Sequence, residues 1–263
     1  MKYLIKGIVV LLLFSLTEKA QAQGPPITGD KPILLGAKRM VFKTLTEYRS
    51  LESGDYLHAP FMFHYLPTSN SLLGIHIPFV SSESFGAVRA SESQKSGIGD
   101  MQLLGKYQFW RRDGMGKTLR LVAKTFNSIP TGEEINLPGV IQGKFQSFNG
   151  LVLGYESLKY GISSELGYNY VQESEQDELR YKMGFGLPLK KPSYPVDQIN
   201  LYFEYQSGWF ISLDDYYMLY AQGIQYAKGR VTIEASVQFP LIQAIPEVEK
   251  RKFSVLLGTR FVI

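Results

Sequence analysis

The stretch RVTIEASVQF, residues 230–239, alternates apolar and polar side chains without interruption. Its apolar positions are Val231, Ile233, Ala235, Val237 and Phe239. Because successive side chains of a β-strand point to opposite sides, the stretch predicts a strand with one apolar face. The fold depends on whether that face meets a protein core or lipid.

Twelve segments show this kind of pattern, although the facing of 145–156 and 216–227 is ambiguous. They are 38–49, 56–66, 71–80, 98–110, 118–128, 145–156, 159–171, 179–189, 199–211, 216–227, 230–239 and 252–263. Strands of soluble proteins are commonly about five or six residues long. Crossing the apolar band of an outer membrane, about 25 Å tall, at about 40° of tilt takes roughly 10 residues. The lengths therefore predict an all-β fold: a closed antiparallel transmembrane β-barrel of about twelve strands, over residues 36–263.

The lengths of the connections mostly alternate between long and short, as expected for such a barrel. If both chain ends are periplasmic, odd-numbered connections face outward and should be longer. The long connections at odd positions are 81–96, 130–143 and 240–251, and the short ones at even positions are 67–70, 156–158 and 228–229. The exceptions are the even connections 111–117 and 190–197, which are of middle length, and the odd connection 212–215, which is short.

The N-terminus has the three-part layout of a secretory signal peptide. Lysines in MKYLIK precede the apolar run GIVVLLLFSL, and Ala20-Gln21-Ala22 forms an A-x-A cleavage site. We expect residues 1–22 to be removed, an uncleaved anchor being the alternative. The next segment, 23–35 (QGPPITGDKPILL), is rich in Pro and Gly. It either hangs in the periplasm or folds into the barrel as a plug.

Composition narrows the class further. The chain has no cysteine, so an exported form has no disulfides, which fits a bacterial envelope protein. The net charge of +4 falls to +2 when Lys2, Lys6, Lys19 and Glu18 leave with the signal peptide. Charges of both signs are interspersed along the sequence, which excludes the concentrated basic surface of a nucleic-acid-binding protein. The expected location is the bacterial outer membrane, with lipid and the barrel assembly machinery as partners.

A soluble β-sandwich also alternates and is the structural alternative. The signal peptide, the long strands, their even number and the charged residues among glycines on the polar face together favour a membrane barrel with a wet interior. Twelve strands give a backbone diameter of about 24 Å and, after inward side chains, a passage on the order of 12 Å. Larger porins use 16 to 18 strands, so the geometry favours a narrow pore or a plugged barrel.

Charged residues on the polar faces are the candidate lumen-lining residues. They are Lys106, Arg120, Lys124, Glu165, Arg180, Lys182, Glu204, Glu234 and Arg260. Lys106, Arg120 and Lys124 could form a basic patch on neighbouring strands, and Lys182 is expected nearly opposite Glu204. Either these charges set solute preference along a permeation path, or they only solvate and rigidify the lumen.

Two stretches carry a family resemblance: SGIGDMQLLGKYQF (96–109) and LVAKTFNSIPTGEE (121–134). Gly97-Ile98-Gly99-Asp100, Lys106-Tyr107 and Pro130-Thr131-Gly132 resemble a family of Gram-negative outer-membrane barrels named for the phenol-degradation meta-pathway. The similarity is clearest over residues 96–190. The resemblance implies a transport function, with aromatic solutes suggested by the family label, and carries over no binding or catalytic residues.

The function predicted from the sequence is a narrow channel for passive uptake or efflux of small solutes, aromatic ones among them. The alternatives are a non-conducting structural or adhesive surface barrel and an outer-membrane hydrolase. We predict no enzyme, no cofactor and no metal site: the mature chain has only His58, His64 and His76, and the first two are separated by roughly 20 Å of strand. No nucleophile, base and orienting group can be assembled from the sequence.

Overall fold

The computed structural model describes residues 26–32, 35–83, 95–133, 143–190 and 196–263, so the expected signal peptide lies outside the described residues. The strands, with one short 3-10 helix η1 (Glu247–Glu249), are β1(Arg39–Leu51), β2(Gly54–Leu66), β3(Ser71–Glu83), β4(Lys95–Ile98), β5(Met101–Gly114), β6(Lys117–Ile129), β7(Gln146–Ser157), β8(Gly161–Val171), β9(Glu178–Pro188), β10(Asp197–Phe210), β11(Asp215–Lys228), β12(Val231–Ala244) and β13(Arg251–Val262). No helix in the described part of the chain is long and apolar enough to span a membrane.

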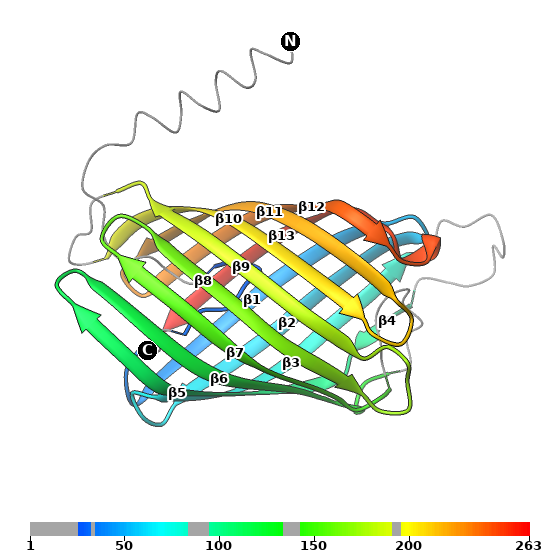
Figure 1. The fold of residues 1–263 in the computed structure, drawn as a ribbon, viewed down its shortest axis with the longest axis horizontal. Helices are drawn as coiled ribbons and strands as arrows, with labels where there is room; N and C mark the ends of the chain where they lie inside the picture. The colour runs from blue at the N-terminus through cyan, green and yellow to red at the C-terminus, as the bar shows by residue number, and fades with distance from the viewer. Residues whose placement is uncertain (1–25, 33–34, 84–94, 134–142, 191–195) are drawn as a thin grey trace, which may run out of the picture.

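The strands form one closed antiparallel barrel (Figure 1). Strands that follow one another in sequence pair with each other, except that β4 pairs only with β3 and β5 pairs with β3 and β6; β1 also pairs with β13 from Val41↔Val262 to Leu51↔Arg251. β4 and β5 both pair with β3 and are two parts of one wall strand, so the wall has twelve strands, as the sequence predicted. Closure leaves no open sheet edge, which is the condition for a β-structure in lipid.

The two ends of the barrel differ. We call the end that carries connections 52–53, 172–177, 211–214 and 245–250 the loop end. The opposite end, where Met40 N donates to Ile263 O at 3.1 Å, is the terminus end. Its hairpins at 115–116 and 229–230 are only two residues long, and Gly116 and Gly229 supply the positive φ angles that such turns need.

All twelve predicted strand regions are present, with two corrections to the connections. The expected connection 111–117 shrinks to two residues, because Arg111 and Asp113 continue β5 beyond a bulge between Gln108 and Trp110. The expected connection 240–251 shrinks to 245–250, because β12 continues to Ala244. The charged or proline-containing sequence at these sites suggested a loop, but a strand that protrudes beyond the lipid tolerates such residues.

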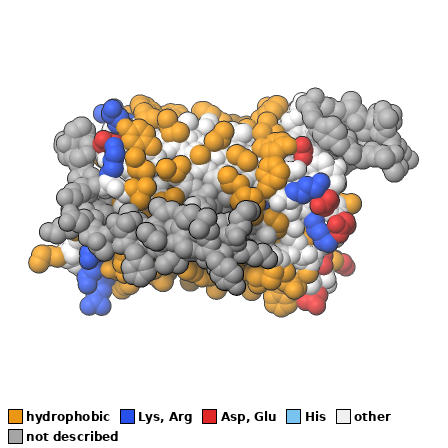
Figure 2. Space-filling view, turned by 90° about the horizontal axis from the view of Figure 1, so that it is seen from above, with side chains coloured by type: hydrophobic (Ala, Val, Ile, Leu, Met, Phe, Trp, Pro, Cys, Tyr) orange, Lys and Arg blue, Asp and Glu red, His pale blue; other side chains and the backbone are white. Residues whose placement is uncertain are grey.

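The outer face of the barrel is apolar. The outward side chains that are at least 43 % exposed include Phe61, Leu73, Ile75, Ile77, Tyr107, Leu151, Leu166, Ile224, Ile233 and Leu257. Figure 2 shows hydrophobic side chains on the uncovered part of one face, between the two ends, and charged side chains at both ends. The two tryptophans are exposed towards opposite ends, Trp110 on β5 and Trp209 on β10. A soluble barrel would leave this surface in water, whereas acyl chains match it.

The exposure of the side chains shows which face of β7 and of β11, the two strands of ambiguous facing, points into the barrel. On β7, Phe148 and Val152 are buried inside and Leu151 and Leu153 face outward. On β11, Leu219, Ala221 and Gln225 point inward. The interior also contains an apolar cluster of Val41, Leu66, Leu72 and Leu104, so it is less uniformly polar than the sequence predicted.

The family-like motifs Gly97–Asp100 and Pro130–Gly132 are hydrogen-bonded to each other at the loop end, and we call this arrangement the clasp. The chain breaks its strand pairing at Gly99-Asp100, and the buried Asp100 carboxylate accepts hydrogen bonds from Thr131 N (3.1 Å), Gly132 N (2.9 Å) and Gly143 N (2.8 Å). A Cβ at position 132 would lie 2.4 Å from the Gly99 carbonyl carbon, so glycine is required there. The G-x-G-D and P-T-G motifs therefore join the chain segments on either side of the β5–β6 hairpin.

We predict that Leu151→Lys, near the middle of the outward face of β7, destabilises the barrel by about 2–4 kcal/mol, because a lysine at mid-membrane depth leaves water. Urea titration in phospholipid vesicles measures the change. Ser69→Lys, in the exposed connection 67–70, is the control and should leave the free energy of unfolding almost unchanged. Equal effects of the two substitutions would contradict a lipid-facing Leu151.

We predict that Asp100→Ala lowers the free energy of unfolding by about 1–3 kcal/mol, because three backbone N–H groups lose their acceptor. Asp197→Ala is the control: its exposed carboxylate contacts Lys190 Nζ at 3.0 and 3.1 Å and should contribute less than about 1 kcal/mol. The same urea titration compares the two variants, and a loss no larger than the control's would show that the clasp is dispensable.

Candidate functional site

Residues 26–32 lie inside the barrel, so this part of the segment 23–35 occupies the lumen rather than hanging outside it. Wall glycines make room for it. A Cβ at Gly223 would lie 2.4 Å from Ile27 Cδ1, and a Cβ at Gly154 would lie 2.4 Å from Pro32 Cγ. The glycines on the polar faces of these strands thus shape the wall around residues 26–32, which we call the lumen segment.

Glu204 on β10 anchors the first half of the lumen segment. Its carboxylate accepts the backbone N–H groups of Ile27, Thr28 and Gly29, each at 2.7 Å, and the Thr28 hydroxyl. Glu204 itself is only 3 % exposed. A buried carboxylate needs such donors, and hydrogen bonds to a charged acceptor are stronger than those between neutral groups.

Asp30 anchors the second half against a different part of the wall. Lys106 on β5 contacts Asp30 Oδ1, and Lys124 on β6 lies 2.9 Å from Asp30 Oδ2. Lys124 also lies 2.8 Å from Glu165 Oε2 on β8. The two lysines face each other in register across the β5–β6 pair. One carboxylate therefore bridges two ammonium groups that would otherwise repel each other.

The charge state of Asp30 follows from these contacts. Burial by itself raises the pKa of a carboxyl group, but the two lysines outweigh it and hold the pKa of Asp30 well below its usual value. The two lysines therefore favour the charged carboxylate form of Asp30.

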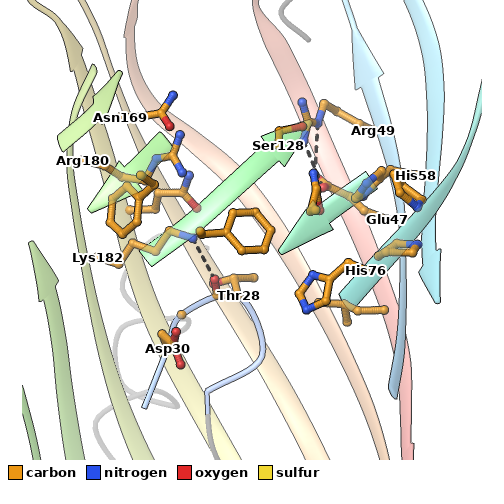
Figure 3. Close-up of a pocket in the computed structure, with 18 of the residues that line it drawn as sticks. Thr28, Asp30, Glu47, Arg49, His58, His76, Ser128, Asn169, Arg180 and Lys182 are labelled. Carbon is orange, nitrogen blue, oxygen red and sulfur yellow. Dashed lines mark hydrogen bonds and ion pairs between the residues drawn. The ribbon is translucent and has the colours of Figure 1, made fainter. Parts of the chain in front are cut away.

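Lys182 on β9 also holds the lumen segment, since its Nζ donates to Thr28 O at 3.2 Å. Figure 3 shows this bond, with Asp30 nearby. The expected opposition of Lys182 and Glu204 was wrong by one inward position: Lys182 pairs in register with Gln206, and Glu204 with Gly184. Both charged groups bind the lumen segment instead.

A cavity of about 600 Å³ lies between the lumen segment and the loop end. Its floor is Ile27–Asp30, and its walls reach Leu51, Gln176 and Glu249 at the loop end. Figure 3 shows Arg180 and Lys182 on one side of it and Glu47, Arg49, His58 and His76 on the other. Towards the terminus end, the inward side chains of Val122, Val152 and Tyr202 are at most 2 % exposed. Among the described residues, the lumen is thus hollow towards the loop end and filled towards the terminus end.

The other sequence-predicted charges lie in separate clusters of the interior. Arg180 Nη2 donates to Glu178 Oε2 at 2.5 Å. Glu234 binds Lys43 at 2.9 Å and Gln225 at 2.9 Å. Arg260 Nη2 donates to Thr232 Oγ1 at 3.3 Å.

Arg120 does not join Lys106 and Lys124 in one basic patch. It pairs in register with Arg111, nearer the terminus end, and donates to Gln108 Oε1 at 3.5 Å. The predicted patch of three therefore reduces to the pair Lys106 and Lys124.

Several charged lumen residues escaped the sequence analysis. They include Asp30, Lys31, Lys43, Glu47, Arg49, Glu156, Glu178 and Arg251. Arg49 donates to Glu47 at 3.0 and 3.1 Å, and Arg251 Nη1 lies 3.5 Å from Glu47 Oε1. A signal was available on β1, because Lys43, Glu47 and Arg49 share the parity of inward residues. Asp30 had no such signal, since an irregular segment has no period.

The three histidines also face the interior. His64 and His76, on paired strands, lie 2.8 Å apart between their Nε2 atoms, a proximity that the sequence did not predict. His58 stacks with Tyr56 instead. The described residues contain no group of three or more metal-ligating side chains.

A twelve-stranded closed barrel with an apolar outer band and a charged, segment-filled interior is the architecture of an outer-membrane β-barrel. Solved structures agree at the level of the fold. The COG4313 outer membrane channel from Pseudomonas putida F1 aligns at a TM-score of 0.58 and 13 % identity, over 92 % of this chain and 100 % of that one. The expected fold of the family-like barrels is thereby confirmed.

Two porins align as well. The NanC porin has a TM-score of 0.52 at 9 % identity, and the KdgM porin 0.50 at 7 %; each match covers 84 % of this chain and 98 % of the porin. No family model and no curated protein sequence matches the chain. At these identities the likeness establishes the fold, and the solute has to be argued from the residues of this chain.

We predict that Glu204→Gln loosens the lumen segment, because the amide keeps one acceptor oxygen but loses the negative charge. Since the chain has no cysteine, Gly29→Cys can serve as a single reporter. Its labelling by a water-soluble maleimide should become severalfold faster with Glu204→Gln. Glu234→Gln makes the same chemical change at a lumen residue that contacts Lys43 and Gln225, and should leave the rate unchanged. Equal rates in all three backgrounds would show that Glu204 is not an anchor.

Proposed function

We propose that the protein is a passive outer-membrane channel for small solutes and that the lumen segment is its plug. The observation that carries the proposal is the way in which residues 26–32 are held. Glu204, Lys106, Lys124 and Lys182 hold the segment through hydrogen bonds and ion pairs, which water can replace when the segment leaves. The barrel wall has its own continuous hydrogen bonding and does not need the segment for closure.

The outer surface supports two partners for this channel. Its apolar band fits the acyl chains of the outer membrane, and a twelve-stranded barrel of this kind is a client for the barrel assembly machinery. The size of the cavity, about 600 Å³, supports small molecules as the solutes and excludes folded proteins.

A tether tests the plug directly. A side chain at position 154 would begin 2.4 Å from Pro32 Cγ, so Pro32→Cys with Gly154→Cys places two cysteines within reach of a disulfide. We predict that the oxidised double variant does not conduct in planar bilayers and that reduction raises its conductance. Each single variant, insensitive to oxidant and reductant, is the control.

The outcome separates the channel from the main alternative, a non-conducting structural or adhesive barrel. If the reduced tether variant and a Glu204→Gln variant both fail to conduct and to admit solutes into liposomes, the channel proposal is wrong and the non-conducting barrel is supported. A hydrolase gains no support from the histidines, whose contacts are with Tyr56, Phe126 and one another.

A further inference from the structure

We propose that Lys106 and Lys124 form a carboxylate-binding site of the channel, and that Asp30 occupies this site as an internal ligand while the channel is plugged. The inference rests on the proposed channel function and names its solute class: small organic carboxylates.

The geometry of Asp30 is that of a bound carboxylate. Each of its two oxygens takes one ammonium group, Oδ1 from Lys106 and Oδ2 from Lys124. The lysine side chains are only 8 % and 13 % exposed, so little water shares the site. Charge-assisted hydrogen bonds of this kind depend on the carboxylate and not on the chain that carries it. A free carboxylate can make the same two contacts.

The wall needs an anion at this place. Lys106 and Lys124 are direct register partners, and like charges directly opposite each other are destabilising. Glu165 lies 2.8 Å from Lys124 and offsets part of the charge, but the bridge between the two lysines is Asp30. When the lumen segment leaves, the bridging position becomes a site for an anion from solution.

The cavity joins this site to the loop end. Asp30, Lys106 and Lys124 all line the cavity that extends to the loops. The rings of Phe126 and Phe148 line it beside them, and Lys124 Nζ lies 5.1 Å from the centre of the Phe148 ring. The site therefore offers two cations for a carboxylate and apolar surface for the carbon skeleton attached to it.

Release of the segment also frees Glu204, the other anchor. Glu204 lies on β10, four strands round the wall from β6, so it is separate from the lysine pair. A carboxylate that competes with Asp30 favours the unplugged state, because it binds only when Asp30 has left. Solute binding and plug release are thus coupled through the same two lysines.

Three solutes of one six-carbon skeleton test the site: gluconate, an anion; sorbitol, its neutral counterpart; and N-methylglucamine, a cation. In liposome swelling with the native protein we expect gluconate to enter severalfold faster than sorbitol and N-methylglucamine to enter slowest. Lys106→Gln with Lys124→Gln should abolish the ratio of gluconate to sorbitol while raising sorbitol entry, since Asp30 loses its partners. Lys43→Gln, which removes a lumen lysine bound to Glu234, is the control and should keep the ratio.

A second variant covers the case in which the double lysine variant does not fold. Asp30→Asn leaves both lysines without their internal ligand and should shift the reversal potential in a KCl gradient towards chloride. An unchanged reversal potential, or a gluconate-to-sorbitol ratio of one in the native protein, overturns the carboxylate site. Failure of every solute to enter, even through the reduced tether variant, would instead overturn the channel itself.

Discussion

The structure depends on the requirement that every backbone hydrogen bond within lipid be made inside the protein. For a β-sheet this requirement means closure, and here β1 and β13 meet over eleven residue pairs to provide it. Closure in turn separates two surfaces by the alternation of each strand. Apolar side chains such as Leu151 and Ile233 face outward, while Glu165, Glu204 and Glu234 are turned into the interior.

An interior of this kind must satisfy its charges without bulk water. Towards the terminus end some charges are satisfied within the wall, for example Glu234 by Lys43 and Gln225, while Glu156 is paired with Lys31 of the lumen segment. At mid-height the lumen segment completes the charge pairing of the described residues: it supplies donors to Glu204 and the carboxylate that bridges Lys106 and Lys124. The segment is thus bound as a ligand would be, by polar contacts in a recess shaped by glycines. The same complementarity explains how a plug can be both specific and removable.

The family-like motifs have a structural explanation that is independent of solute. Asp100 and Gly132 belong to a clasp in which one carboxylate orders two chain segments at the loop end. The charged residues that contact the lumen segment, by contrast, are scattered over β5, β6, β7, β9 and β10, and no local motif connects them.

The sequence by itself determined the wall. Alternation and strand length predicted twelve strands, their order and the inward parity of residues such as Lys124 and Glu204, because a strand's facing has a period of two and needs no distant information. It left the facing of β7 and β11 open, since glycine and tyrosine there are compatible with either side. Only the tertiary structure decided which side chains contact one another across neighbouring strands and across the lumen. The register that moves Lys182 away from Glu204, the approach of His64 to His76, and the capture of Asp30 by two lysines all depend on closure of the barrel, which brings together residues that no local pattern relates.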